Sequence, residues 1–118
     1  MTLKMEEFIN DRHGATYVPG LERYPDATAH LFDTLNNPEI VGRMEVAQEL
    51  GHPALTGAVT FVEADPAIVE ALEGSPRFHQ AVGVAVRLKM EERGWSKTGR
   101  KGVVTGSRYF NRSEHYTR

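Results

Sequence analysis

Apolar side chains recur at helical spacing in three consecutive stretches of the chain. Each stretch begins with a capping side chain followed by proline, which already has a helical φ angle and has no N–H to leave unpaired. Each is followed by a glycine, a residue that tolerates the left-handed turn after a helix. The pattern therefore predicts helices over residues 38–50, 66–73 and 76–93.

The third of these helices also contains a stretch that alternates like a strand, from Val82 to Met90. The capped start, the glycine stop and the helix-favouring residues before it all agree with a helix, and eighteen residues would make a very long strand. We therefore expect a helix over 76–93. Its apolar stripe at helical spacing is Phe78, Ala81, Val82, Ala85 and Leu88.

Two regions favour extended structure. Residues 58–63 are rich in Val, Thr and Phe, which predicts a short strand. Residues 100–104 and 107–112 flank a Thr-Gly turn at 105–106 and predict a hairpin.

Two further helices are predicted upstream, over residues 3–11 and 26–35. With no repeat or linker to divide the chain, we expect one domain, mainly α with a small antiparallel β-sheet. Its predicted parts are an N-terminal helical extension over 1–37, a core over 38–112 and a tail over 113–118.

From residue 38 the predicted order is helix, strand, helix, tight turn, long helix and hairpin. This order resembles the winged helix-turn-helix superfamily over residues 38–112, about two thirds of the chain. The resemblance implies a winged-helix-like core whose long helix enters the major groove of DNA. It also implies that the hairpin touches the flanking DNA backbone.

Charge is distributed unevenly along the chain. The formal net charge is only −2, from 14 Lys and Arg against 16 Asp and Glu. Residues 1–74 carry 4 basic and 13 acidic residues, a net of −9, whereas residues 75–118 carry 10 and 3, a net of +7. The change falls at the turn before the long helix. A basic surface there indicates either a polyanionic partner or a partner for the acidic half.

The face of the long helix opposite its apolar stripe carries side chains suited to DNA bases. Arg and Gln hydrogen-bond base edges, and a glycine at position 83 permits close approach of either DNA or another helix. Basic residues in and around the hairpin suit phosphates. The predicted nucleic-acid-binding residues are Arg77, Gln80, Arg87, Lys97, Arg100, Lys101, Arg108 and Arg112.

Two aromatic residues, Tyr109 and Phe110, fall on opposite faces of the predicted second hairpin strand. One is therefore expected to pack in the core and the other to be available for stacking. Packing is the favoured interpretation for aromatic residues near the end of a strand.

Other chemistry has little support in the sequence. The absence of cysteine excludes disulfides and thiolate sites, and the five histidines lack metal-site spacing. Glu63 and Asp65 could form a metal pair on one side of a strand, but a helix cap is the simpler role for Asp65. The residue types of a metal-independent ribonuclease occur close together near the C-terminus: Arg112, Glu114, His115 and Tyr116. Neighbours in an exposed tail rarely form a preorganised site, so we predict no metal, cofactor or catalytic residue.

These observations favour a small, non-enzymatic DNA-binding protein, with duplex DNA as partner and a regulatory role. The alternative is a protein-interaction or self-assembly module, as a homodimer or in head-to-tail contact, that pairs the acidic N-terminal half with a basic surface. Residues 1–10 lack an apolar signal core, and the longest uncharged run, residues 50–62, has thirteen residues. A membrane-spanning helix needs about 20. A cytoplasmic protein without a membrane partner is therefore expected.

Overall fold

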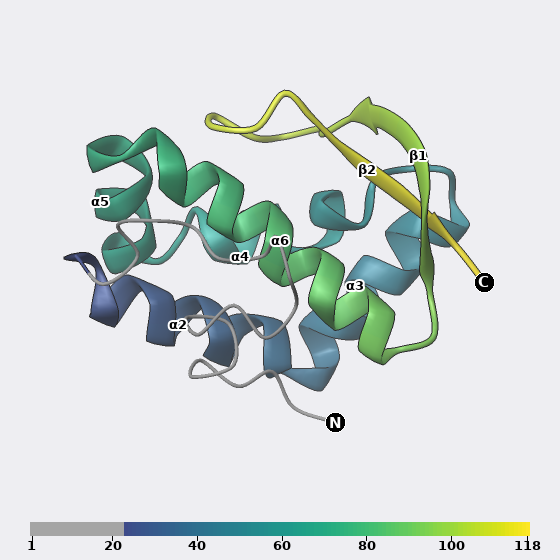
Figure 1. Ribbon diagram of the computed structural model, residues 1–118, viewed down its shortest axis with the longest axis horizontal. Helices are drawn as coiled ribbons and strands as arrows, with labels where there is room; N and C mark the ends of the chain where they lie inside the picture. The colour runs from purple at the N-terminus through teal and green to yellow at the C-terminus, as the bar shows by residue number, and fades with distance from the viewer. Residues whose placement is uncertain (1–22) are drawn as a thin grey trace.

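Residues 23–118 are the part of the chain that the computed structural model describes. The elements, in chain order, are α2 (Pro25–Asn36), α3 (Pro38–Glu49), the 3₁₀ helix η2 (Ala54–Gly57), α4 (Val59–Val62), α5 (Pro66–Gly74), α6 (Pro76–Glu92), β1 (Ser96–Val103) and β2 (Arg112–Thr117). The predicted class, mainly α with a small antiparallel sheet, is confirmed. Helix α6 crosses the middle of the molecule, with α2 along one side and the hairpin of β1 and β2 along the other (Figure 1).

Two of the three predicted helix starts, those of α3 and α5, form with a capping side chain. Asn37 Oδ1 accepts a hydrogen bond from the backbone N–H of Glu39 at 3.0 Å. Asp65 Oδ1 accepts one from the N–H of Ala67 at 2.9 Å. Because these caps are local, the bounds of α3 and α5 lie within one residue of those predicted. The bounds of α6 also lie within one residue of the prediction, although the Ser75 side chain forms no capping hydrogen bond. The predicted helix over 26–35 is confirmed as α2, and the one over 3–11 lies outside the described residues.

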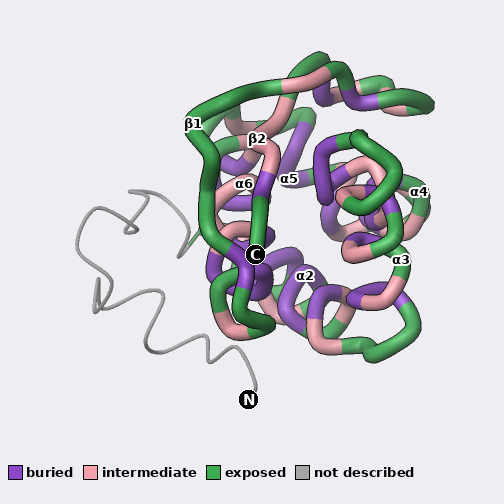
Figure 2. Tube along the Cα trace, turned by 90° about the vertical axis from the view of Figure 1, so that its right-hand side faces the viewer, coloured by how far each residue is buried: buried purple, intermediate pink, exposed green. Residues whose placement is uncertain are grey.

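The core forms where the inner faces of the helices meet. All five residues of the predicted stripe on α6 are buried. The largest side chains with almost no exposure include Leu31, Leu35, Met44, Leu55, Ile68 and Phe78. The helices turn their buried sides toward one another, whereas β1 is exposed along nearly its whole length (Figure 2). The hairpin is thus a surface layer placed over a helical core.

The strand predicted over 58–63 is wrong, because this region continues from η2 into the short helix α4. Ala58, Val59 and Val62 are all buried, a spacing that fits one inward face of a helix. The backbone at Gly57 lies so close to that of Arg43 in α3 that any side chain at position 57 would clash. Tertiary packing therefore overrides the strand preference of Val, Thr and Phe.

The hairpin exists, but its second strand lies further along the chain than predicted. Residues 107–111 belong to a loop over 104–111, only residue 112 of the predicted strand lies in β2, and β2 occupies most of the segment predicted to be a tail. Strand β2 pairs antiparallel with β1, with Lys101 opposite Glu114 and Val103 opposite Arg112. Tyr109 and Phe110 accordingly lie in a loop and not on opposite faces of a strand.

A bulge bends β1 between Lys97 and Lys101. These residues lie opposite Tyr116 and Glu114, so three residues of β1 face one residue of β2. Gly99 within the bulge has a φ angle of +83°, which a residue with a side chain rarely adopts. Because their partners are only two residues apart on one face of β2, the bulge brings the two lysines together on the same side of the hairpin.

None of the helices within residues 23–118 combines the length and the apolar character needed to cross a lipid bilayer.

Candidate nucleic-acid interface

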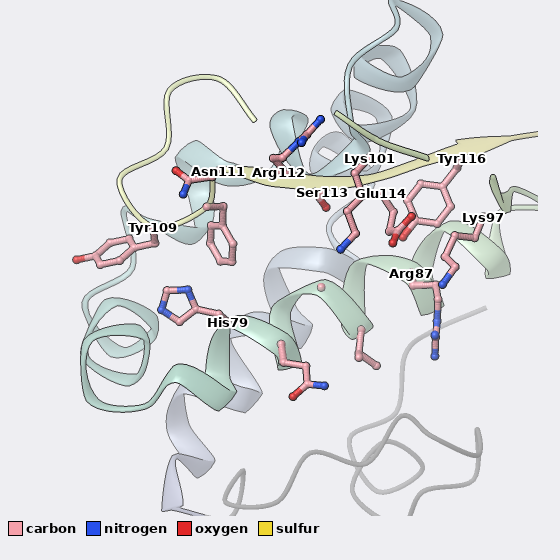
Figure 3. A pocket seen from close by; sticks show the side chains of 14 residues that line it. His79, Arg87, Lys97, Lys101, Tyr109, Asn111, Arg112, Ser113, Glu114 and Tyr116 are labelled. Atoms are coloured by element: carbon pink, nitrogen blue, oxygen red, sulfur yellow. The ribbon is translucent and has the colours of Figure 1, made fainter. Parts of the chain in front are cut away.

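A cavity of about 600 Å³ lies between α6 and the hairpin. Helix α6 contributes the face around Gly83, from His79 to Arg87. The hairpin contributes Lys97 and Lys101 from β1 and Glu114 from β2. Figure 3 shows Lys101 and Glu114 extending from the hairpin toward α6, whereas the side chain of Arg87 extends downward from α6 in this view. The cavity is therefore built by elements that are separate in the sequence.

Five of the eight predicted nucleic-acid-binding residues line this cavity. They are Gln80, Arg87, Lys97, Lys101 and Arg112. A Cβ atom added at Gly83 would meet no atom within 4 Å, so close helix packing does not require glycine there.

The other three predicted residues lie elsewhere. Arg77 is exposed in the first turn of α6. Arg100 lines a second cavity, of about 320 Å³, beside Gln48. Arg108 lies 3.9 Å from the carboxylate of Glu63 and over the ring of Tyr109, with its guanidinium carbon 5.3 Å from the ring centroid.

The basic residues that form ion pairs and those that line the cavity are two separate sets, and Arg23, Arg77 and Arg100 belong to neither. Those that form ion pairs within 4.0 Å lie outside the cavity: Arg43, Lys89, Arg93, Arg108 and Arg118. The four cations that line the cavity, Arg87, Lys97, Lys101 and Arg112, form no ion pair with a described carboxylate. The cavity thus gathers positive charge that the fold leaves uncompensated.

Two residues that line the cavity, one on α6 and one on β2, each have a buried polar atom with no hydrogen-bond partner among the described residues. These atoms are Nε of Arg87 and Oε2 of Glu114. Buried polar atoms in proteins are nearly always hydrogen-bonded, so these two are available to a bound group. The cavity offers such a group both a cationic donor and a carboxylate acceptor.

Tyr116 packs beside this pair of charges and is itself buried. Burial raises the pKa of its hydroxyl far above the usual range, and the charge of Glu114 raises the pKa further, although Arg87 opposes this. Tyr116 therefore stays neutral and packs against the core below the hairpin.

Aromatic rings form the opposite end of the cavity. The ring centroid of His79 lies 5.4 Å from that of Phe110 and 6.1 Å from that of Tyr109. His79 Nε2 is 3.0 Å from the carbonyl oxygen of Leu72, and the hydroxyl of Tyr109 donates to Glu73 Oε2 at 2.6 Å. Phe110 is buried, and Tyr109 keeps part of its surface exposed. Hydrogen bonds thus hold this end in place before anything binds.

The loop that carries these aromatic residues is anchored by Glu63 at the end of α4. Glu63 accepts hydrogen bonds from the Ser107 hydroxyl at 2.5 Å and from the backbone N–H of Arg108 at 3.0 Å. The Ser107 oxygen in turn accepts from the N–H groups of Tyr109 and Phe110, at 3.1 and 2.8 Å. This anchor explains why residues 107–110 do not join the strand.

Glu63 and Asp65 are both engaged in structural contacts. Asp65 caps α5 and also pairs with His30 Nδ1 at 2.9 Å. In the described part of the chain, no three His, Asp or Glu residues come together as a set that could hold a metal ion.

Of the ribonuclease-like residues near the C-terminus, His115 is separated from the other three, which line the first cavity. Neighbouring residues of a strand point to opposite faces, and His115 lines the second cavity, where its Nδ1 lies 3.3 Å from Gln48 Nε2. Glu114 faces the first cavity. The predicted tail over 113–118 left Glu114 and Tyr116 outside any binding site, yet both line the first cavity. The sequence did hold a signal for this: Glu114 and Tyr116 are two residues apart, and residues so spaced share one face of a strand.

No protein-family model matches this chain, and comparisons with curated proteins and with solved structures find no match.

Proposed function

We propose that this protein is a small, non-enzymatic DNA-binding protein with a regulatory role, which holds phosphates in the cavity between α6 and the hairpin. The observation that carries the proposal is the convergence of four cations without ion pairs from α6, β1 and β2. Basic side chains that have no partner in the protein can replace the counterions of a phosphate backbone. The winged-helix-like core and a cytoplasmic location are parts of the same proposal.

The proposal predicts a definite dependence of binding on salt. If all four cations contact phosphates, the logarithm of the binding constant should fall against the logarithm of salt with a slope of about −3. Between 50 and 200 mM salt such a slope corresponds to roughly a 60-fold loss of affinity. Fluorescence anisotropy of a labelled DNA, used both as a single strand and as a duplex, measures this slope directly.

A matched pair of double variants tests whether the cavity carries the binding. Lys97→Gln/Lys101→Gln removes two charges from the cavity, and Arg23→Gln/Arg43→Gln removes two exposed charges away from it. The first should make the salt slope shallower by about 1.5, and the second should leave it nearly unchanged. Equal effects of the two variants would contradict the assignment of the site. Absence of binding to either form of DNA at 20 mM salt would contradict the function itself.

A further inference from the structure

We propose that the cavity binds a single strand of nucleic acid in preference to a duplex, with a base at Tyr109 and phosphates at Arg87, Lys97 and Lys101. This inference rests on the proposed function and specifies the form of its ligand. It follows from the shape of the cavity, from the chemistry at its two ends and from the buried carboxylate of Glu114.

The shape of the cavity opposes entry of α6 into a DNA groove by its basic face. Gln80 and Arg87 line one cavity together with Lys97 and Lys101, so the hairpin borders the cavity that this face of the helix lines. The major groove is about 12 Å wide and admits a single helix, whose diameter is about 10–12 Å with its side chains. A helix with a strand pair along that side is roughly 20 Å across. A thinner ligand that enters between helix and hairpin avoids this conflict.

The size of the cavity fits a short piece of a single strand. Its volume of about 600 Å³ lies within the range of sites that enclose a small molecule. Its aromatic end, near Gln80, and its cationic end, near Arg87, are seven residues apart along α6, or about 10 Å. One or two nucleotides can therefore place a base at one end and phosphates at the other.

The Tyr109 ring is held by neighbouring side chains in a position where a base can stack on it. Its hydroxyl is held by Glu73 at 2.6 Å, and Arg108 covers one face of the ring. Because Arg108 does not line the cavity whereas Tyr109 does, the other face of the ring is the one presented to a ligand. Stacking of a base on such a ring tolerates any sequence and depends on an unpaired base.

Glu114 argues against a ligand that is only a polyanion. Its buried Oε2 lacks a hydrogen bond from any described residue and would repel a bare phosphate chain. The amino groups of unpaired bases can donate to a carboxylate, whereas inorganic polyphosphate has no such donor. The combination of four cations, one carboxylate and an aromatic ring therefore suits nucleic acid better than other polyanions.

Competition binding to the full chain compares the ligands directly. The probes are a mixed-sequence 12-nucleotide DNA, the same sequence as RNA, its DNA duplex, and inorganic polyphosphate of equal charge. At 50 mM salt we expect at least one of the single strands to bind at least about tenfold more tightly than the duplex or the polyphosphate, with the RNA and DNA strands ranked by the same measurement. Equal or tighter binding of the duplex or the polyphosphate would overturn the inference, and duplex binding would still leave DNA binding intact. Failure of every nucleic acid to bind would remove both proposals.

Gly83 allows the cavity to be filled without disturbing the fold. A Cβ atom there meets nothing within 4 Å, and replacing a glycine within a helix favours the helix. Gly83→Leu should therefore keep or raise the melting temperature while lowering affinity for the single strand at least about tenfold. Gly42→Leu in α3 is the matched control, because an added Cβ atom there also meets nothing within 4 Å, and the affinity of this variant should not change. Retained affinity in a folded Gly83→Leu protein would overturn the inference.

Tyr109 variants test the aromatic end separately. Tyr109→Ala should reduce affinity for the single strand by about fivefold to a hundredfold without changing the salt slope. Tyr109→Phe keeps the ring, loses only the hydrogen bond to Glu73, and should retain most of the affinity. Wild-type affinity in Tyr109→Ala, or an equal loss in both variants, would contradict stacking on this ring.

Discussion

Three carboxylates from the acidic half hold distant parts of the chain together. Glu45 of α3 accepts hydrogen bonds from the Trp95 indole at 3.0 Å and from Arg118 at 2.8 Å, and so fixes both ends of the hairpin. Burial alone would raise the pKa of Glu45, but its hydrogen bonds and the neighbouring guanidinium charges outweigh burial and lower the pKa. Glu63 holds the hairpin loop, and Asp65 joins α2 to α5 through His30. Part of the charge asymmetry is therefore used within the fold.

The contact between His30 and Asp65 makes one part of the stability dependent on pH. The hydrogen bond and charge of Asp65 raise the pKa of His30 above 6.5. A raised folded pKa means that His30 contributes its full stabilisation below pH 6.5 and loses it as the pH rises through the folded value. We expect His30→Ala to lower the free energy of unfolding more at pH 5.5 than at pH 8.5, as measured by urea denaturation. In an Asp65→Asn background the difference between the two pH values should become much smaller, because only the weaker charges of Asp26 and Asp33 still raise the pKa of His30, and an undiminished difference would contradict this pairing.

At the scale of elements, the sequence is informative where the determining contacts are local. The helix starts at Asn37 and Asp65 were predictable because the capping acceptor and the N–H it binds are two residues apart. The strand over 58–63 was predicted wrongly because its outcome depends on packing against α3. The hairpin register was missed because the loop is anchored by Glu63, whose bond to Ser107 spans 44 residues. Long-range contacts of this kind leave no local signal.

The sequence made it possible to predict several residues of the candidate site, but not how the fold arranges them. Charge and helical periodicity identified Arg87, Lys97 and Lys101, which the fold brings together. The same criteria also selected Arg100, which the fold places at a separate cavity. Glu114 became part of the first cavity only once β2 was known to include it. The strand boundaries therefore decide which charges converge.

The loop anchor gives a test at this scale. The side chain of Glu63 is only 9% exposed, and its replacement by Ala would leave Ser107 and the Arg108 N–H without their acceptor. We expect Glu63→Ala to cost roughly 1–3 kcal/mol of stability in a urea denaturation experiment. Trypsin should then cleave faster after Arg108, as followed by mass spectrometry. Glu70→Ala, at an exposed position on α5, is the control, and equal cleavage in the two variants would contradict the anchoring role.

At the scale of the whole molecule, uncompensated charges of opposite sign are carried by different elements. The hairpin and its lysines lie along one side of α6, whereas α2 lies along the other (Figure 1). Asp33 of α2 and Glu70 of α5 are exposed and form no ion pair within the described chain. Such a distribution orients the molecule toward a polyanion and opposes binding through the acidic side. It also suits the alternative hypothesis, in which the acidic side of one copy meets the basic side of the next.

Neutralising the acidic side separates these two roles. The described residues extend over 35 × 29 × 25 Å, so charges on opposite sides interact over a distance comparable to the Debye length of about 30 Å at 10 mM salt. At 150 mM salt that length is about 8 Å and the interaction is screened. We therefore expect Asp33→Asn/Glu70→Gln to bind DNA more tightly than wild type at 10 mM salt and equally at 150 mM, measured by anisotropy.

If the acidic side instead binds a second copy, sedimentation should show wild-type self-association at 10 mM salt that the variant lacks. A gain in DNA affinity that persists at 150 mM salt would contradict a purely long-range effect. At that salt concentration, only acidic residues close to the bound DNA could still weaken its binding.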